Sequence, residues 1–350
     1  MSLSPGFDSP IALVRAEYVL PFIDLLRRTG TPVERELRRA RLPALIEELP
    51  DSYVSTDLLF RFLQHCAERE GISNIGFEAG WQLCYDDLGP VLKDALQQAP
   101  TLKIAIETFS RLISLEDSEF RCSLQGCGGK KRICIRQYIP AGADSRIAEW
   151  QNLKAVLELV RRYRQAGPTS LTIGMMSSNP PTPDEHDRLE NIRVLTGQQS
   201  TFVEIPASML AHPRMPGKDS FHRRRKGSSV LPGSRDLPGF EDDLTSRLRM
   251  ALIPYLSSGN PGIELAADIA GISVRKLQRR LDLMHTSYSR LLESLRFEQA
   301  LNLLQHSDLK ILDIALLLGY NDASNFARAM RRISGLSPRE LRGNGIDGTR

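Results

Sequence analysis

The sequence predicts an α+β N-terminal domain followed by an all-α C-terminal domain that holds two helix-turn-helix units joined by a spacer helix. Three observations lead to this fold class. The chain has 350 residues, more than one hydrophobic core usually holds. Its apolar fraction of 41% and charged fraction of 25% are those of an ordinary globular protein. A helical pattern in the last third occurs twice, 48 residues apart. We therefore expect domains over 1–213 and 240–342, a basic flexible linker over 214–239 and a tail over 343–350.

Helix signals dominate the first hundred residues. Thr31-Pro32-Val33-Glu34 combines a capping box with proline at the first helical position, so a helix is expected to begin there. A second helical pattern covers Leu58–Arg69 and ends at Gly71. A third begins at Pro100-Thr101 and continues to about Leu112. Helices therefore lead this domain.

Strand signals begin at Ser118. The segments Phe120–Gln125 and Arg132–Tyr138 alternate in polarity on either side of the glycine-rich Gly126–Gly129, which predicts a hairpin. The elements expected after it are a helix near Ser145–Arg164, an extended segment over Ser170–Met176, a helix near Asp184–Thr196 and a strand over Phe202–Ile205.

The internal repeat consists of Ala267-x-x-x-Gly271 and Ala315-x-x-x-Gly319. A small alanine lets two helices approach closely, and glycine supplies the positive φ of a tight turn between them. Leu277 lies six residues after the first glycine and Phe326 seven after the second, each placed to anchor a second helix in the core. We therefore expect two helix-turn-helix units, the second with a turn one residue longer.

The second helix of the first unit is predicted to begin after the N-cap Ser273. When its leucines face inward, two arginines and a glutamine share an outward face. Arginine can donate two hydrogen bonds to guanine and glutamine can pair with adenine in the major groove. The candidate DNA-contacting residues of this unit are Ser273, Arg275, Lys276, Gln278, Arg279 and Arg280.

The second helix of the second unit is capped by Asp322 or Asn321 and presents smaller groups. Ala323 makes no hydrogen bond, so a thymine methyl group is its expected target. Arg331 and Arg332 suit phosphates, which fix position but carry no sequence information. The candidate DNA-contacting residues here are Ala323, Ser324, Asn325, Arg328, Arg331 and Arg332. Since the first unit holds more arginine and glutamine, we expect it to supply most of the base specificity.

A spacer helix is expected over Thr286–Gln305, and a capping box at Ser337-Pro338-Arg339-Glu340 opens a closing helix. A stiff spacer fixes the separation of the two readers. Two successive major-groove faces lie about one helical turn apart, roughly 34 Å. One chain would thus read two adjacent, unlike half-sites.

This C-terminal stretch resembles the AraC/XylS family of bacterial transcription regulators. The motifs that carry the resemblance are Leu295–Ala300, Ile311–Ala315, Leu318-Gly319-Tyr320 and Gly335–Arg339. The family's base-contacting positions fall on Arg275, Gln278 and Arg279 in the first helix-turn-helix unit, and on Ala323, Ser324, Asn325 and Arg328 in the second. His285 departs from the family, which usually has glycine there, and histidine tolerates the left-handed conformation. The resemblance implies double-stranded promoter DNA and RNA polymerase as partners, with activation or repression left open.

The N-terminal half is similar to the effector-binding domain of a subset of that family, the one that begins with helices. Its motifs are Leu88-Gly89-Pro90, Ala99–Leu102, Leu195-Thr196-Gly197 and Ile205–Ser208. This resemblance implies binding of a small-molecule effector or dimerisation, and it leaves both the ligand and a homodimer open.

Candidate sites outside the DNA-binding module rest on single residue types. Trp81, Tyr85, Phe109 and Trp150 are candidates for an effector pocket, although aromatic residues in a helical pattern are more often core. Cys122 and Cys134, on opposite arms of the hairpin, form either a redox pair or, more commonly, two packing thiols. The cysteines and histidines show no metal-ligand spacing, so we expect neither a metal nor another cofactor.

Charge is uneven along the chain. The net charge is −3 over 1–213, +6 over 214–235 and +2 over 240–342, and the linker holds the run His222–Lys226. This run is either a solvated tether or a nonspecific phosphate contact. Charged residues interrupt the N-terminal region, so we expect no signal peptide or membrane span and a cytoplasmic protein.

Two other classes of function compete with a regulator. The first is an enzymatic N-terminal domain with an accessory DNA module, but the sequence holds no nucleophile elbow, phosphate loop or zinc-protease helix. The second is an architectural DNA binder, which would show little preference between specific and random DNA.

Overall fold

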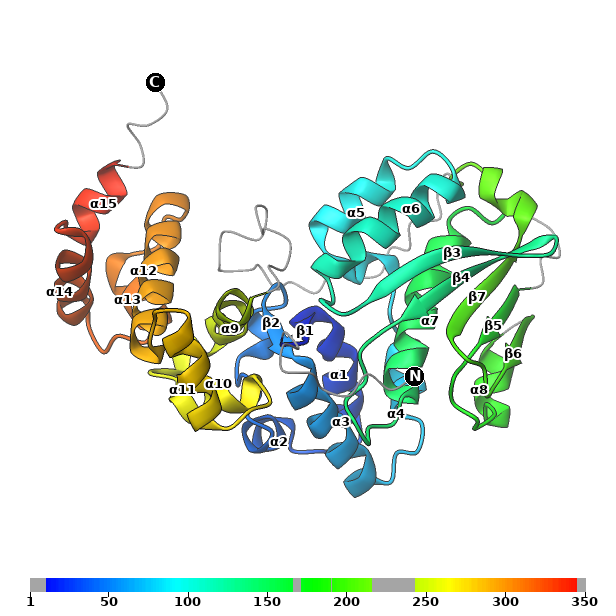
Figure 1. Cartoon of the computed structure of the whole chain (residues 1–350), viewed down its shortest axis with the longest axis horizontal. Helices are drawn as coiled ribbons and strands as arrows, with labels where there is room; N and C mark the ends of the chain where they lie inside the picture. Colours follow the sequence, from blue (N-terminus) through cyan, green and yellow to red (C-terminus); the bar gives the residue numbers. More distant parts are fainter. Residues whose placement is uncertain (1–10, 166–170, 190, 216–242, 345–350) are drawn as a thin grey trace. The chain divides into compact units, whose positions relative to one another are not determined.

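The computed structural model describes residues 11–165, 171–189, 191–215 and 243–344. They form two compact units, and Figure 1 labels their elements. Unit 1 consists of Met1–Ala16, Leu37–Leu58 and Gly227–Arg350, and unit 2 of Glu17–Glu36 and Leu59–Lys226. Most of the predicted linker, including His222–Lys226, and most of the tail lie outside the described residues.

Unit 2 is built around a mixed five-stranded sheet in the order β3-β4-β7-β5-β6. All neighbouring strands are antiparallel except β5 and β6, which run parallel. The helix α7 (Arg146–Arg161) packs against the central strand β7 (Figure 1), whose apolar residues Phe202, Val203 and Ile205 are buried. The strands are β3 (Arg121–Cys127), β4 (Lys130–Arg136), β5 (Leu171–Gly174), β6 (Ile192–Leu195) and β7 (Thr201–Pro206). The predicted hairpin and the strand before Pro206 are confirmed.

Helices contact this sheet at β3 and β7, and several begin where the sequence predicts. The Thr101 hydroxyl accepts a hydrogen bond from the Ile104 N–H at 3.5 Å and so caps α6. The helices with residues in unit 2 are α1 (Leu20–Arg28), α2 (Val33–Arg39), α3 (Thr56–Glu70), α4 (Ile75–Gly80), α5 (Pro90–Gln97), α6 (Leu102–Leu112), α7 (Arg146–Arg161) and α8 (Pro183–Arg188). The C-terminal end of α2, from Leu37, and the beginning of α3, up to Leu58, belong to unit 1.

The helix predicted over Asp184–Thr196 is wrong in its second half. The capping box is present, since the Thr182 N–H donates to the Glu185 carboxylate at 2.7 Å. However, α8 ends at Arg188, and Asn191 takes a φ of 63°. The chain then enters β6, whose main chain pairs with β5. Pairing with a neighbouring strand therefore outweighed the helical spacing of this short segment.

The two hairpin cysteines do not form a redox pair. Cys122 is paired with Ile135 and Cys134 with Ser123, so the register places the two thiols on opposite faces of the sheet. Both cysteines are free. Burial raises the pKa of the Cys122 thiol to about 11, which keeps it protonated and unreactive.

Unit 1 contains a helical array and one short ribbon. In the ribbon, β1 (Leu13–Arg15) pairs antiparallel with β2 (Tyr53–Ser55), a contact that the sequence did not predict. The helical array confirms the all-α C-terminal domain. Its elements are α9 (Leu244–Leu252), the 3₁₀ helix η7 (Ile253–Ser258), α10 (Ile263–Ile269), α11 (Val274–Leu283), α12 (Tyr288–His306), α13 (Ile311–Leu317), α14 (Ala323–Ser334) and α15 (Pro338–Asn344). Within the described part of the chain, no helix is long and apolar enough to cross a membrane.

Candidate DNA-binding surface

The first helix-turn-helix unit is formed by α10 and α11. Gly271 has a φ of 63° in the turn, and the Ser273 hydroxyl accepts a hydrogen bond from the Lys276 N–H at 3.3 Å. Leu277 and Leu281 are almost completely buried, at 0% and 1% exposure. The turn glycine, the cap and the inward leucines therefore agree with the sequence prediction.

The outer surface of α11 divides the predicted contact residues into two groups. Arg275, Gln278 and Arg279 are exposed, and no hydrogen bond or ion pair within the described residues occupies their side chains. Lys276 and Arg280 are half-buried and interact with other groups of the protein. Three side chains capable of reading base edges are thus displayed together, since positions 275, 278 and 279 share one helical face.

The second unit is formed by α13 and α14. Gly319 has a φ of 78°, and a Cβ atom there would lie 2.4 Å from the Leu256 carbonyl oxygen and 2.6 Å from that of Gly259. Glycine is therefore required both by the backbone conformation and by the close approach of η7. Phe326 is fully buried and packs against Tyr320, with ring centroids 5.4 Å apart. The α14 helix begins one residue later after its glycine than α11 does, as predicted.

The outer surface of α14 is organised by its N-cap. Asp322 accepts hydrogen bonds from the Asn325 main-chain N–H and from the Asn325 side-chain amide, each at 2.7 Å. The Asn325 amide oxygen in turn accepts a hydrogen bond from the Arg328 guanidinium. Arg328 and Ser324 are exposed, whereas Ala323 is half-buried. Unlike the readers of α11, two of the predicted readers of α14 are bonded to each other.

The two arginines assigned to phosphates differ in their surroundings. Arg331 and Arg332 are both exposed near the C-terminal end of α14. The Arg332 guanidinium forms an ion pair with Glu293 of α12. Because this pair is exposed, it contributes little to stability, and the guanidinium remains accessible to a stronger anion such as a phosphate.

The helix α12 connects the two units as the predicted spacer. Its N-cap Ser287 accepts a hydrogen bond from the Arg290 N–H, and His285 just before it has a φ of 55°. Arg296 of this helix donates a hydrogen bond to the Gly259 carbonyl oxygen at 2.9 Å. The helix α12 itself packs on α9, α13 and α15. The buried residues of the spacer are Leu291, Leu292, Leu295, Ala300, Leu303 and Leu304. Because these residues bury one face of α12 along its length, the spacer holds the two helix-turn-helix units in one arrangement.

The hydroxyl of Tyr288 reinforces the start of the spacer. It donates a hydrogen bond to the Pro261 carbonyl oxygen at 2.7 Å, and burial raises the pKa of Tyr288 to about 12. The phenol therefore remains a neutral donor at physiological pH.

Two segments from early in the chain, within 11–16 and Leu37–Leu58, also belong to unit 1 and contact its helices. Arg247 of α9 is 1% exposed and donates to the Ile11 carbonyl oxygen at 2.9 Å. The Tyr255 hydroxyl donates to the Arg41 carbonyl oxygen at 2.8 Å. The Ser55 hydroxyl donates to the carbonyl oxygen of Ile269, the last residue of α10, at 3.2 Å. The frame of the first helix-turn-helix unit is thus built partly from residues that lie two hundred positions earlier in the sequence, which no local pattern signals.

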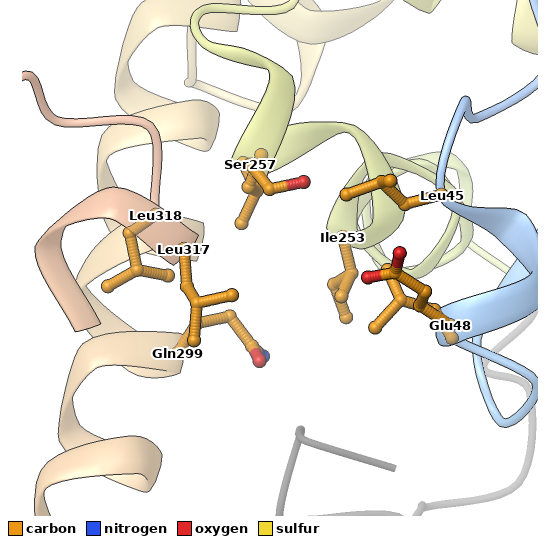
Figure 2. A pocket seen from close by; sticks show the side chains of 9 residues that line it. Leu45, Glu48, Ile253, Ser257, Gln299, Leu317 and Leu318 are labelled. Carbon is orange, nitrogen blue, oxygen red and sulfur yellow. The ribbon is translucent and has the colours of Figure 1, made fainter. Parts of the chain in front are cut away.

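A small cavity within unit 1 lies where the segment Leu37–Leu58 meets the second helix-turn-helix unit. Figure 2 shows Leu317, Leu318 and Gln299 on one side of it and Leu45 and Glu48 opposite. Its volume is about 70 Å³ and its walls are mostly apolar. Pockets for small-molecule ligands usually have several hundred Å³. The cavity is therefore a packing gap next to α13 rather than an effector site.

The four aromatic candidates for an effector pocket lie in different surroundings in unit 2. Trp81 and Trp150 meet edge to face with ring centroids 6.2 Å apart, and both contact Phe77. Tyr85 is instead covered by the Arg162 guanidinium at 3.7 Å. Phe109 is fully buried against Phe120, with ring centroids 6.0 Å apart. The structure brings two of the four together, and an effector role for any of them stays a prediction.

Unit 2 contains a fully buried carboxyl group with a raised pKa, that of Asp117. Burial raises the pKa of Asp117 to about 6, although hydrogen bonds from the Glu119 main chain and the Gln137 side chain favour its ionised form. The Gln137 amide donates to Asp117 at 2.7 Å and accepts a hydrogen bond from Asn152. Burial is thus the main reason that Asp117 titrates close to physiological pH, and the nearby Glu119 carboxylate raises its pKa further.

Comparison with protein families assigns both halves of the chain. Residues 30–214 match the family model for the arabinose-binding N-terminal domain of AraC transcription regulators, and residues 266–344 match a helix-turn-helix domain. The chain belongs to the AraC family of transcription regulators. As a member of this family, it is a DNA-binding transcription regulator with an N-terminal effector-binding domain.

Two curated relatives align over most of the chain, and a third over a much shorter stretch. The ornithine utilization regulator of Pseudomonas aeruginosa is 24% identical over 333 residues, 94% of this chain and 96% of the relative. The transcriptional regulator VirS of Mycobacterium tuberculosis is 24% identical over 340 residues, 95% of this chain and 97% of the relative. The transcriptional activator RhaS of an Enterobacter species is 40% identical over 81 residues, 23% of this chain and 29% of the relative.

Two solved structures of transcription factors resemble the chain with TM-scores below 0.5. The transcriptional regulator CdpR from Pseudomonas aeruginosa shares 17% identity and a TM-score of 0.39, with 93% of this chain and 98% of that chain covered. The DNA-binding domain of AdpA in complex with target DNA shares 24% identity and a TM-score of 0.27, with 31% of this chain and 96% of that chain covered.

Proposed function

We propose that this AraC-family regulator reads two adjacent, unlike half-sites in double-stranded promoter DNA through α11 and α14. The observation that carries the proposal is the display of Arg275, Gln278 and Arg279 on one face of α11 without protein partners in the described structure. Exposed arginine and glutamine at this spacing match guanine and adenine edges in the major groove. The second unit, held by the buried spacer, adds Ala323, Ser324, Asn325 and Arg328.

Phosphate contacts flank these readers in the proposal. Ser273 is the N-cap of α11, Lys276 lies in the first turn of that helix and Arg280 in its last turn. Arg331 and Arg332 lie near the end of α14. Such contacts fix the register of a protein on the duplex without reading its sequence. The basic linker over 214–239 would add salt-sensitive affinity.

The N-terminal domain would control this reader. A small-molecule effector bound in 1–213, or a homodimer formed through it, would change how the two units engage a promoter, and RNA polymerase would be the partner at that promoter. The segment Leu37–Leu58 supports such coupling, because it belongs both to the family's N-terminal domain and to the compact unit that holds α10 and α11. A cytoplasmic location follows from this role.

The test is selection of bound sequences from a library of randomised duplex DNA by the full-length protein. We expect enrichment of a site with two unlike halves, and a preference over random DNA of about a thousandfold or more. Equal binding to all duplexes would instead identify an architectural binder. Mapping of bound sites across the genome would then indicate the regulated genes and the effector's pathway.

A further inference from the structure

Asn325 and Arg328 are not equivalent on the outer surface of α14. Every polar group of the Asn325 side chain already has a partner in the protein. The amide nitrogen donates to the Asp322 carboxylate at 2.7 Å, and the amide oxygen accepts from the Arg328 guanidinium. An asparagine reads adenine by offering both its donor and its acceptor to one base edge. The amide keeps one further N–H and one further lone pair. The bonds to two charged groups fix the plane of the amide, so turning it to present both groups to one base edge would break them.

The bonds that hold Asn325 are of the stronger kind. Its donor faces a carboxylate and its acceptor faces a guanidinium, and hydrogen bonds to charged groups are about twice as strong as neutral ones. Asp322 is itself fixed, because it also caps the helix by accepting the Asn325 main-chain N–H at 2.7 Å. The chain Asp322–Asn325–Arg328 therefore extends from the helix cap to the guanidinium and orients it.

We propose that Asn325 is a positioning residue that holds Arg328, and that Arg328 alone reads a base through hydrogen bonds in the second half-site. This inference rests on the proposed function. A guanidinium keeps several N–H donors after one is bonded to Asn325, so it can still engage a guanine edge. Ser324 is exposed but its hydroxyl both donates and accepts, so it discriminates weakly between bases. The second half-site should accordingly contain one dominant guanine.

The first unit provides the contrast. Gln278 occupies the outer face of α11 without a hydrogen-bonding partner in the described residues, and its amide is free to meet a base. The two units would thus use their side-chain amides differently, one as a reader and one as a support. This difference makes Gln278 the matched control for Asn325.

The experiment uses the full-length protein and the site selected from randomised duplexes. Binding is measured for the wild type, Asn325→Ala, Arg328→Ala and the double variant, on the selected site and on every single base-pair substitution of its second half. We expect Arg328→Ala to weaken binding about tenfold or more and to abolish the preference at one guanine. Asn325→Ala should weaken binding to the selected site several-fold and reduce the preference at that same base pair. It should have no further effect in the Arg328→Ala background.

Three further measurements separate the possible outcomes. Asp322→Ser keeps a residue able to cap α14 but removes the carboxylate that holds the Asn325 amide, so it should relax the same guanine partially. Gln278→Ala combined with Arg328→Ala should show additive losses, because the two residues lie in different units. Circular dichroism should show unchanged helix content for each variant.

The proposal is overturned if Asn325→Ala relaxes a different base pair, or if its effect persists in the Arg328→Ala background. Either result would make Asn325 a direct reader while the proposed function stands. If the wild type selects no sequence at all, the proposed function fails, and that outcome is distinguishable because it precedes any variant.

Discussion

Two glycines with the same backbone conformation provide a direct test of how the second helix-turn-helix unit is packed. Gly319 and Gly335 both have a φ of 78°. A Cβ atom at Gly335 would meet nothing within 4 Å, whereas one at Gly319 would lie 2.4 Å from the Leu256 carbonyl oxygen. The substitutions Gly319→Ala and Gly335→Ala therefore share the cost of the left-handed conformation, about 1–2 kcal/mol. They differ only in the clash.

The size of the clash follows from the neighbours. Real Cβ atoms essentially never approach within 3.0 Å of another heavy atom, so Gly319→Ala must displace a carbonyl group by at least 0.6 Å (3.0 minus 2.4). The Leu256 oxygen accepts from the Gly259 N–H, and the Gly259 oxygen accepts from Arg296, so movement strains both bonds. Overpacking of this kind costs about 1–3 kcal/mol. We expect Gly335→Ala to destabilise by about 1–2 kcal/mol and Gly319→Ala by about 2–5 kcal/mol.

Denaturant unfolding of the full chain measures this difference with two probes. Both tryptophans, Trp81 and Trp150, belong to unit 2, so their fluorescence reports that unit, whereas circular dichroism reports the helices of both. The circular dichroism transition attributable to unit 1 should shift more for Gly319→Ala than for Gly335→Ala, and DNA binding should weaken in the same order. Equal destabilisation by the two substitutions would refute the reasoning, because it would mean that the carbonyl groups of Leu256 and Gly259 can move away from the new Cβ atom at no cost in free energy.

Three other predictions concern charge. Since the folded-state pKa of Asp117 is raised to about 6 from 3.8, its contribution to stability is present below about pH 4 and is lost as pH rises through 6. Asp117→Asn should therefore stabilise unit 2 increasingly from about pH 4 to about pH 6, and by a constant amount of up to about 3 kcal/mol at higher pH; a pH-independent difference in unfolding free energy would contradict this. Arg279→Ala should relax discrimination at one base pair by about 1–3 kcal/mol, and a uniform loss on all sequences would make it a phosphate contact. Replacing 223–226 with serine should flatten the salt dependence of DNA binding, and an unchanged slope would leave the linker a tether.

The helical array of the C-terminal domain was predictable because its signals are local. Gly271 and Gly319 mark turns at positive φ, and Ser273 and Asp322 cap the helices that follow. Each signal acts within a few residues, and the repeat supplies each one twice. The exposed face of α11 then follows from helical geometry alone.

The contacts that escaped prediction are those between distant segments. The chain after Asn191 becomes a strand because β5 is available beside it, not because of its own spacing. The ribbon of β1 and β2, and the Ser55 hydrogen bond to Ile269, join positions whose sequence carries no mutual signal. Likewise, residue types on α14 predict which side chains are exposed, but only the structure shows that Asn325 is bonded on both sides.

The two readers consequently differ in the entropy that DNA binding would remove. The exposed arginines of α11 must each be immobilised on binding, and ordering one long side chain costs about 0.5–1.5 kcal/mol. Arg328 is already held by Asn325, so less freedom is lost when it meets a base. The helix α11, with three side chains that have no partner in the described structure, can make more contacts with bases. The helix α14, with one guanidinium that is already held, loses less affinity for each contact that it makes. The first unit would therefore determine most of the sequence preference, and the second would set a single position at low cost.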